Sequence, residues 1–72
     1  MTNTELLEQK IYESGKKKGF LAQKCGLSRV GFRNCVTNKA DFSASQITIL
    51  CEELAITSFR EKEAIFFAKS GA

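Results

Sequence analysis

The stretch that decides the fold reads LAQKCGLSRVGFRNCVTN and occupies residues 21–38. Its spacing fits two short helices that cross steeply over a tight turn. Ala22 is small enough to let the second helix pack closely against the first, and Gly26 can adopt the left-handed conformation that closes the first helix. Leu27, just after the turn, is apolar and can fill the corner between the helices. We expect the second helix to begin after Ser28, whose side chain suits an N-cap.

The second helix of this pair, expected over 29–37, has one apolar face and one largely polar face. Phe32 and Val36 lie one turn apart and are expected in the core. The outward positions are then taken by Arg29, Val30, Gly31, Arg33, Asn34 and Thr37. In the major groove of DNA, arginine can pair bidentately with guanine and asparagine with adenine. The pattern predicts a helix-turn-helix that presents these six residues to base pairs or to a binding partner.

Helical spacing also governs the N-terminal part of the chain, where no alternating run of β-branched residues indicates a strand. An N-terminal helix is expected over 3–13, with Thr2 and Glu5 as a capping box. The first helix of the central pair is expected over 17–24, with three residues facing inward, namely Phe20, Leu21 and Cys25. Asn38 is placed to close the helix that follows.

Two further helices are expected after this segment. The fourth helix combines a capping box with a hydrophobic staple, carried by Phe42, Ser43, Gln46 and Ile47. The fifth helix is expected to begin after Ser58, with Glu61 at its third position, and to run to about Lys69. Residues 1–72 are therefore expected to form a single all-α domain, a compact bundle of five helices.

Basic residues are concentrated in the middle of the chain. From Lys10 to Lys39 there are eight basic residues and one acidic residue, a net charge of +7, while both flanks are mildly acidic. Such asymmetry indicates an anionic partner, with a plain solvated surface as the alternative. The residues expected to contact DNA phosphates are Lys16, Lys17, Lys18, Gln23, Lys24, Ser28 and Lys39. Contacts of this kind give affinity and salt dependence but little sequence discrimination.

The run LAQKCGLSR, residues 21–29, resembles the helix-turn-helix of the lambda-repressor and Cro type. The whole chain resembles small phage Cro-like regulators, in stretches that read here LLEQKIYESG (6–15), GLSRVG (26–31), NKADFSASQI (38–47) and EKEAIFFA (61–68). The resemblance implies a lambda-repressor-like bundle that binds double-stranded DNA and regulates transcription in a lysis–lysogeny switch. One variety, the modulator of repression, acts with or against the phage repressor protein itself.

Two residues of the outward face also fit a protein partner. Val30 is apolar, and on DNA it can meet a thymine methyl group. Gly31 costs a helix about 1 kcal/mol relative to alanine, and on DNA it can allow the backbone to approach closely. A flush protein contact would account for both residues. The sequence thus leaves two functions open. One is a DNA-binding regulator, and the other is an antirepressor that binds the phage repressor at its DNA-reading surface.

Three apolar residues, Ile65, Phe66 and Phe67, follow one another in the last expected helix. At about 100° per residue, three neighbours cover more than one face of a helix. We expect part of this set to form a homodimer or partner surface, and a dimer fits two DNA half-sites one helical turn apart. The alternative is that Phe59, Ile65 and Phe66 cap the core and Phe67 alone is exposed.

The residue types argue against several kinds of site. The chain has no histidine and three cysteines without a CxxC pair, so we expect buried, reduced thiols at Cys25, Cys35 and Cys51, with no metal and no cofactor. Nothing suggests the nucleophile and base of an enzyme or a small-molecule substrate. No segment approaches the roughly 20 apolar residues of a membrane span, and the N-terminus lacks a secretion signal pattern. We expect a protein of the bacterial cytoplasm.

Overall fold

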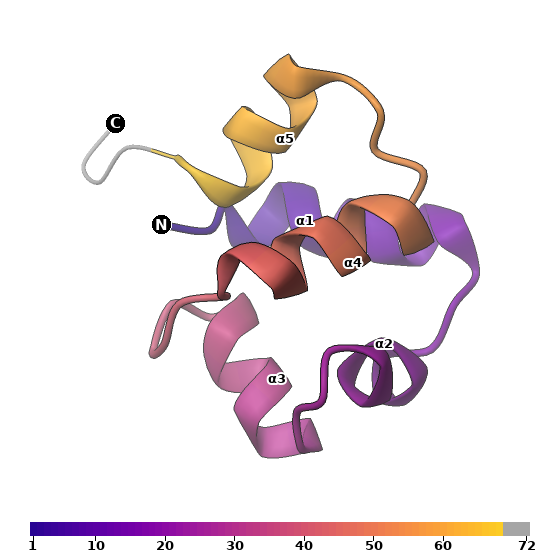
Figure 1. Ribbon diagram of the computed structural model, residues 1–72, viewed down its shortest axis with the longest axis vertical. Helices are drawn as coiled ribbons and strands as arrows, with labels where there is room; N and C mark the ends of the chain where they lie inside the picture. The colour runs from indigo at the N-terminus through magenta and orange to yellow at the C-terminus, as the bar shows by residue number, and fades with distance from the viewer. Residues whose placement is uncertain (69–72) are drawn as a thin grey trace.

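The chain folds into five helices with no strand over residues 1–68, which are the residues that the computed structural model describes. The helices are α1 (Thr4–Ser14), α2 (Lys18–Lys24), α3 (Arg29–Val36), α4 (Ala44–Glu53) and α5 (Phe59–Phe66) (Figure 1). The prediction of an all-helical protein is confirmed. Helices α1, α2 and α3 begin and end within one residue of the expected positions.

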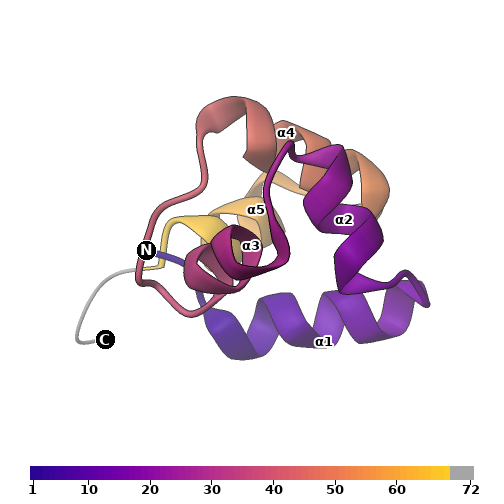
Figure 2. The same cartoon turned by 90° about the horizontal axis from the view of Figure 1, so that it is seen from below.

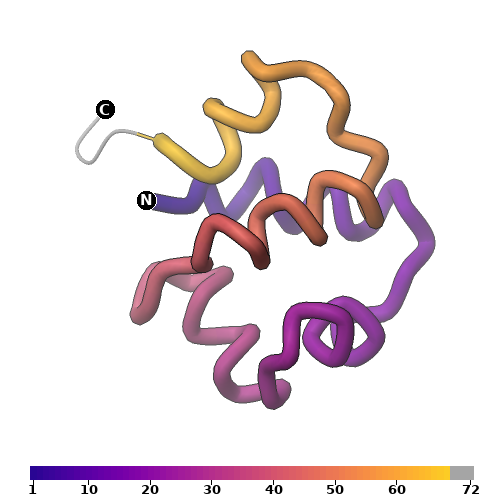
Figure 3. Tube along the Cα trace, viewed as in Figure 1, coloured from indigo at the N-terminus to yellow at the C-terminus, as the bar shows by residue number. Residues whose placement is uncertain are grey.

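The helices surround a single interior. Helices α2 and α3 lie together at one end of the molecule, and α5 lies at the opposite end (Figure 1). In the view turned by 90° (Figure 2), α1 and α4 lie on opposite sides of the interior. The Cα trace brings the start of the chain next to the end of α5 (Figure 3), where the amide of Ala68 donates to the carbonyl of Met1 over 2.8 Å. The radius of gyration, 11.0 Å, is that of a compact chain of this size.

The core joins side chains from every helix. One fully buried side chain comes from each of α1, α2, α4 and α5, namely Leu7, Leu21, Leu50 and Ile65. Phe42, in the connection between α3 and α4, contacts two aromatic rings edge to face. Its ring centre lies 5.8 Å from that of Phe32 and 5.9 Å from that of Phe66. Such edge-to-face pairs add to the stabilisation that burial alone provides.

Serine side chains begin three of the helices, as the spacing predicts. Ser28, Ser43 and Ser58 each accept a hydrogen bond from the backbone amide three residues later, and the side chain of Gln46 completes the capping box of α4. The capping box expected for α1 is wrong. Asn3, not Thr2, is the N-cap and accepts from the amide of Leu6 over 3.1 Å.

Two other predictions are corrected. Phe20 does not face inward, since 42% of its surface is exposed. Helix α2 buries its neighbours Leu21 and Ala22, and the ammonium of Lys24 lies 5.6 Å from the centre of the Phe20 ring. Helix α5 ends at Phe66, earlier than expected, and Lys69 lies outside the described residues.

Asn38 ties the N-terminal segment to the end of α3. Its backbone is left-handed, with φ of 68°, as a residue that closes a helix often is. Its side-chain oxygen accepts from the amide of Thr2 and its side-chain nitrogen donates to the carbonyl of Thr2, both over 2.8 Å. The amide of Asn3 in turn donates to the carbonyl of Ile65 over 2.6 Å. The first residues therefore connect the end of α3 with the end of α5.

Replacing Asn38 with alanine is expected to lower the free energy of unfolding by about 2–3 kcal/mol, because two hydrogen bonds are lost and alanine disfavours a positive φ. Asn38→Gly removes the same bonds without that backbone strain, so it is expected to cost about 1 kcal/mol less than alanine. Urea unfolding followed by circular dichroism measures both values. Equal effects of the two variants would contradict the contribution of the left-handed backbone.

Candidate nucleic-acid interface

The connection between α2 and α3 is a Schellman motif. The amide of Gly26 donates to the carbonyl of Gln23 over 3.0 Å, and the amide of Leu27 donates to the carbonyl of Ala22 over 2.9 Å. The predicted left-handed turn at Gly26 is confirmed, with φ of 71°. Leu27 packs, partly buried, against the core. These contacts fix how the chain leaves α2 and enters α3.

Helix α3 turns Phe32, Cys35 and Val36 into the core. Of the six residues predicted to face outward, Arg29, Val30, Arg33 and Thr37 are exposed, while Gly31 and Asn34 are half-buried. At about 100° per residue, the residues of this set other than Gly31 fall along two lines on the helix. One line follows Arg29, Arg33 and Thr37 along the side next to α1. The other, Val30 and Asn34, points away from Phe32 and Val36.

The glycine at position 31 is explained by contacts within the chain itself. Its amide donates to the capping oxygen of Ser28 over 3.0 Å. A Cβ atom at this position would lie 3.2 Å from that oxygen and 3.7 Å from a side-chain carbon of Leu27. The residue therefore suits the tight start of α3. Its presence in the outward helix does not by itself require a partner to approach closely.

A pocket of about 590 Å³ opens between α1, α2 and α3. Its lining residues are Glu8, Lys18, Gly19, Arg29, Phe32, Arg33, Val36 and Thr37. The guanidinium of Arg29 lies against Gly19, since a Cβ atom there would be only 3.3 Å from its Nη2 atom. Arg29 therefore leans along α2. Sequence reasoning missed Glu8 and Gly19 as parts of this surface.

The lysines predicted to meet phosphates fall into two groups. Lys16 donates from Nζ to the carbonyl of Glu53 over 2.7 Å and to its carboxylate over 2.9 Å. Lys18 lies 2.8 Å from the carboxylate of Glu8, and Lys24 lies over the Phe20 ring. The hydrogen bond from Lys16 lowers the pKa of the Glu53 carboxyl, and the charge of Lys24 adds to that lowering.

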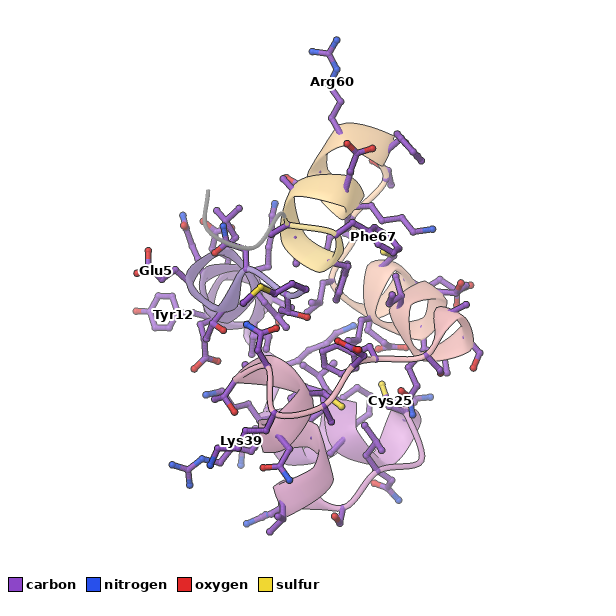
Figure 4. All side chains as sticks on the ribbon, turned by 90° about the vertical axis from the view of Figure 1, so that its left-hand side faces the viewer. Glu5, Tyr12, Cys25, Lys39, Arg60 and Phe67 are labelled. Atoms are coloured by element: carbon purple, nitrogen blue, oxygen red, sulfur yellow. The ribbon has the colours of Figure 1, made fainter. Side chains whose placement is uncertain are left out.

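The second group, Lys17 and Lys39, is exposed to solvent. Lys17 and Lys39 form no ion pair among residues 1–68, and the same holds for Arg29 and Arg33. Figure 4 shows Lys39 in the half of the molecule that contains α2 and α3, far from Arg60, which projects from α5. Gln23 is exposed, whereas the Ser28 hydroxyl is used as the N-cap of α3. These four cations lie on or next to α2 and α3, whereas Arg60 and Lys62, which also form no ion pair among residues 1–68, lie on α5.

The predicted partner surface at the end of α5 is corrected for two of its three residues. Ile65 and Phe66 are 1% and 3% exposed and belong to the core, so neither can form a dimer or partner surface. Phe67 is 54% exposed. The alternative expectation is right for these three residues but wrong for Phe59, which is 73% exposed rather than capping the core.

The cysteines are free, but their burial differs. Cys25 and Cys35 are buried as predicted, and Cys51 is only partly buried. Burial raises the pKa of all three thiols, which disfavours the reactive thiolate. Within residues 1–68, no three acidic or cysteine side chains are grouped closely enough to hold a metal ion.

No protein-family model, no curated protein and no solved structure matches the chain. Among residues 1–68, no helix has the length and apolar character needed to cross a membrane. The function must therefore be inferred from the geometry and charge of the chain itself.

Proposed function

We propose that the protein is a DNA-binding transcriptional regulator in which α2 and α3 form a helix-turn-helix of the lambda-repressor type. The observation that carries this proposal is the Schellman turn at Gly26 leading into α3, whose Ser28 cap and buried Phe32 leave a basic face uncovered. A helix held by its core side over a short turn can enter the major groove with its other side.

The distribution of charge supports an anionic ligand for this face. Arg29 and Arg33 on α3, with Lys17 and Lys39 at the two flanks, are exposed and unpaired among residues 1–68. Cations placed in this way can bind backbone phosphates, and their attraction is independent of sequence. Asn34 and Val30 face away from the core, where they can contact an adenine edge and a thymine methyl group.

The resemblance to phage Cro-like regulators supplies the biological setting of the proposal. In this setting the protein acts in the bacterial cytoplasm on the lysis–lysogeny switch of a phage. Phe67, exposed beside the ends of the described chain, is the residue left to contribute to a homodimer that spans paired half-sites. Ile65 and Phe66 are excluded from that role by burial.

Val30 favours a second candidate function. It is 69% exposed on the line of α3 that points away from the core. An apolar side chain in this position also suits a protein partner, because the buried centre of an interface is more apolar than its rim. The alternative is an antirepressor that binds the phage repressor through the same helix and covers its DNA-reading surface.

A mobility-shift experiment separates these two functions. DNA from the switch region of the parent phage is incubated with the protein alone, with the repressor alone, and with both. We expect a salt-dependent, sequence-specific shift with the protein alone. If the protein alone gives no shift but changes the footprint of the repressor, the antirepressor function replaces the first proposal.

A further inference from the structure

The pocket between α1, α2 and α3 combines three cations with a single acid. Lys18, Arg29 and Arg33 line it together with Glu8. Both carboxylate oxygens of Glu8 lie 2.8 Å from Nζ of Lys18. Neither arginine has an acidic partner among residues 1–68. The acid therefore neutralises only part of the positive charge around it.

Glu8 itself is incompletely satisfied in this pocket. Its Oε2 atom accepts the hydrogen bond from Lys18, whereas Oε1 is nearly cut off from solvent and has no aligned donor. An oxygen in this situation gains electrostatically from the nearby cation but lacks a directed hydrogen bond. Arg29 and Arg33 have no acidic partner among residues 1–68 and remain available to a second anion.

We infer that this pocket receives a backbone phosphate of DNA and that Glu8 acts as its internal counter-ion in the unbound protein. The inference rests on the proposed DNA-binding function and assigns a further site within it. A bound phosphate engages Arg29 and Arg33, while Glu8 holds the ammonium of Lys18 and its carboxylate repels the phosphate. Glu8 thereby lowers the affinity for DNA of every sequence, because phosphates carry no sequence information.

The test is the substitution Glu8→Gln, which keeps the size of the side chain and removes its charge. At 50 mM salt we expect it to raise the affinity for a random-sequence duplex by about 3- to 10-fold. The plot of log affinity against log salt concentration should steepen by about 0.9, because Lys18 becomes free to neutralise one more phosphate. Fluorescence anisotropy with a labelled duplex measures both quantities. The exposed ion pair contributes little to stability, so the variant is expected to fold.

Glu61→Gln is the matched control. Glu61 forms an ion pair with Lys10 over 2.9 Å, and neither residue lines the pocket. The control makes the same change of net charge and breaks the same type of pair, so it is expected to change affinity by less than about 2-fold. An equal gain from Glu8→Gln and Glu61→Gln would overturn the inference and leave the proposed DNA binding intact. Absence of any DNA binding by the wild-type protein at 50 mM salt would overturn both.

Lys18 supplies a second test that does not depend on net charge alone. Lys18→Gln should reduce affinity by less than about 2-fold in the wild type, where Glu8 occupies the ammonium, but by about 3- to 10-fold in the Glu8→Gln background. Equal losses in the two backgrounds would overturn the role of Glu8.

Discussion

Replacing Phe66 with alanine is expected to lower the free energy of unfolding by about 3–5 kcal/mol, whereas Phe67→Ala should change it by less than about 0.5 kcal/mol. Phe66 is 3% exposed and contacts Phe42 edge to face, so its removal leaves a cavity in the core. Phe67 is 54% exposed and follows the last residue of α5. A small domain has little stability in reserve, so a loss of several kcal/mol will unfold a large fraction of the Phe66 variant.

Urea unfolding followed by circular dichroism measures both variants in one experiment. The two substitutions remove the same atoms from adjacent residues, so composition and position along the chain are matched. Similar losses at both positions would contradict the burial pattern at the end of α5. If Phe67→Ala lowers the free energy of unfolding more than Phe66→Ala does, Phe67 belongs to the core and Phe66 to the surface, as a partner surface would require.

These neighbouring phenylalanines illustrate what spacing along the sequence can decide. Serine caps involve residues three positions apart, so the starts of α3, α4 and α5 were predictable from local pattern alone. The end of α5 has no glycine or proline to mark it. Without that boundary, the sequence did not decide which of Ile65, Phe66 and Phe67 faces the core. The tertiary packing decides this question, because Phe42, from a distant segment of the chain, packs against Phe66.

The candidate site was predictable to a similar extent. The turn at Gly26 and the exposed residues of α3 follow from local spacing, which constrains the order of buried and exposed positions within one helix. The pairing of Lys16 with Glu53 joins residues 37 positions apart, and the bonds between Thr2 and Asn38 join residues 36 positions apart. Such contacts depend on how helices are placed in space. Local patterns of charge therefore overstated the number of free lysines.

The two lines of outward residues on α3 should respond differently to mutation if the helix reads DNA. Asn34→Ala is expected to weaken binding to the cognate duplex by about 10- to 100-fold, equivalent to about 1–3 kcal/mol, with little effect on random DNA. Asn34 faces away from Phe32 and Val36, where base edges lie once a helix occupies the groove. Arg33→Ala should weaken binding to both duplexes and flatten the salt dependence by about 0.9, since Arg33 borders the pocket next to α1.

Anisotropy titrations with the cognate and random duplexes at several salt concentrations distinguish base reading from phosphate contact. Val30→Glu provides the comparison for a protein ligand, since it places a charge on the exposed apolar position of α3. If Asn34→Ala leaves the affinity for DNA unchanged while Val30→Glu abolishes binding to the repressor, the outward face of α3 recognises protein. If Asn34→Ala removes discrimination between the duplexes, that face reads bases, and the arginines beside it supply affinity for the backbone.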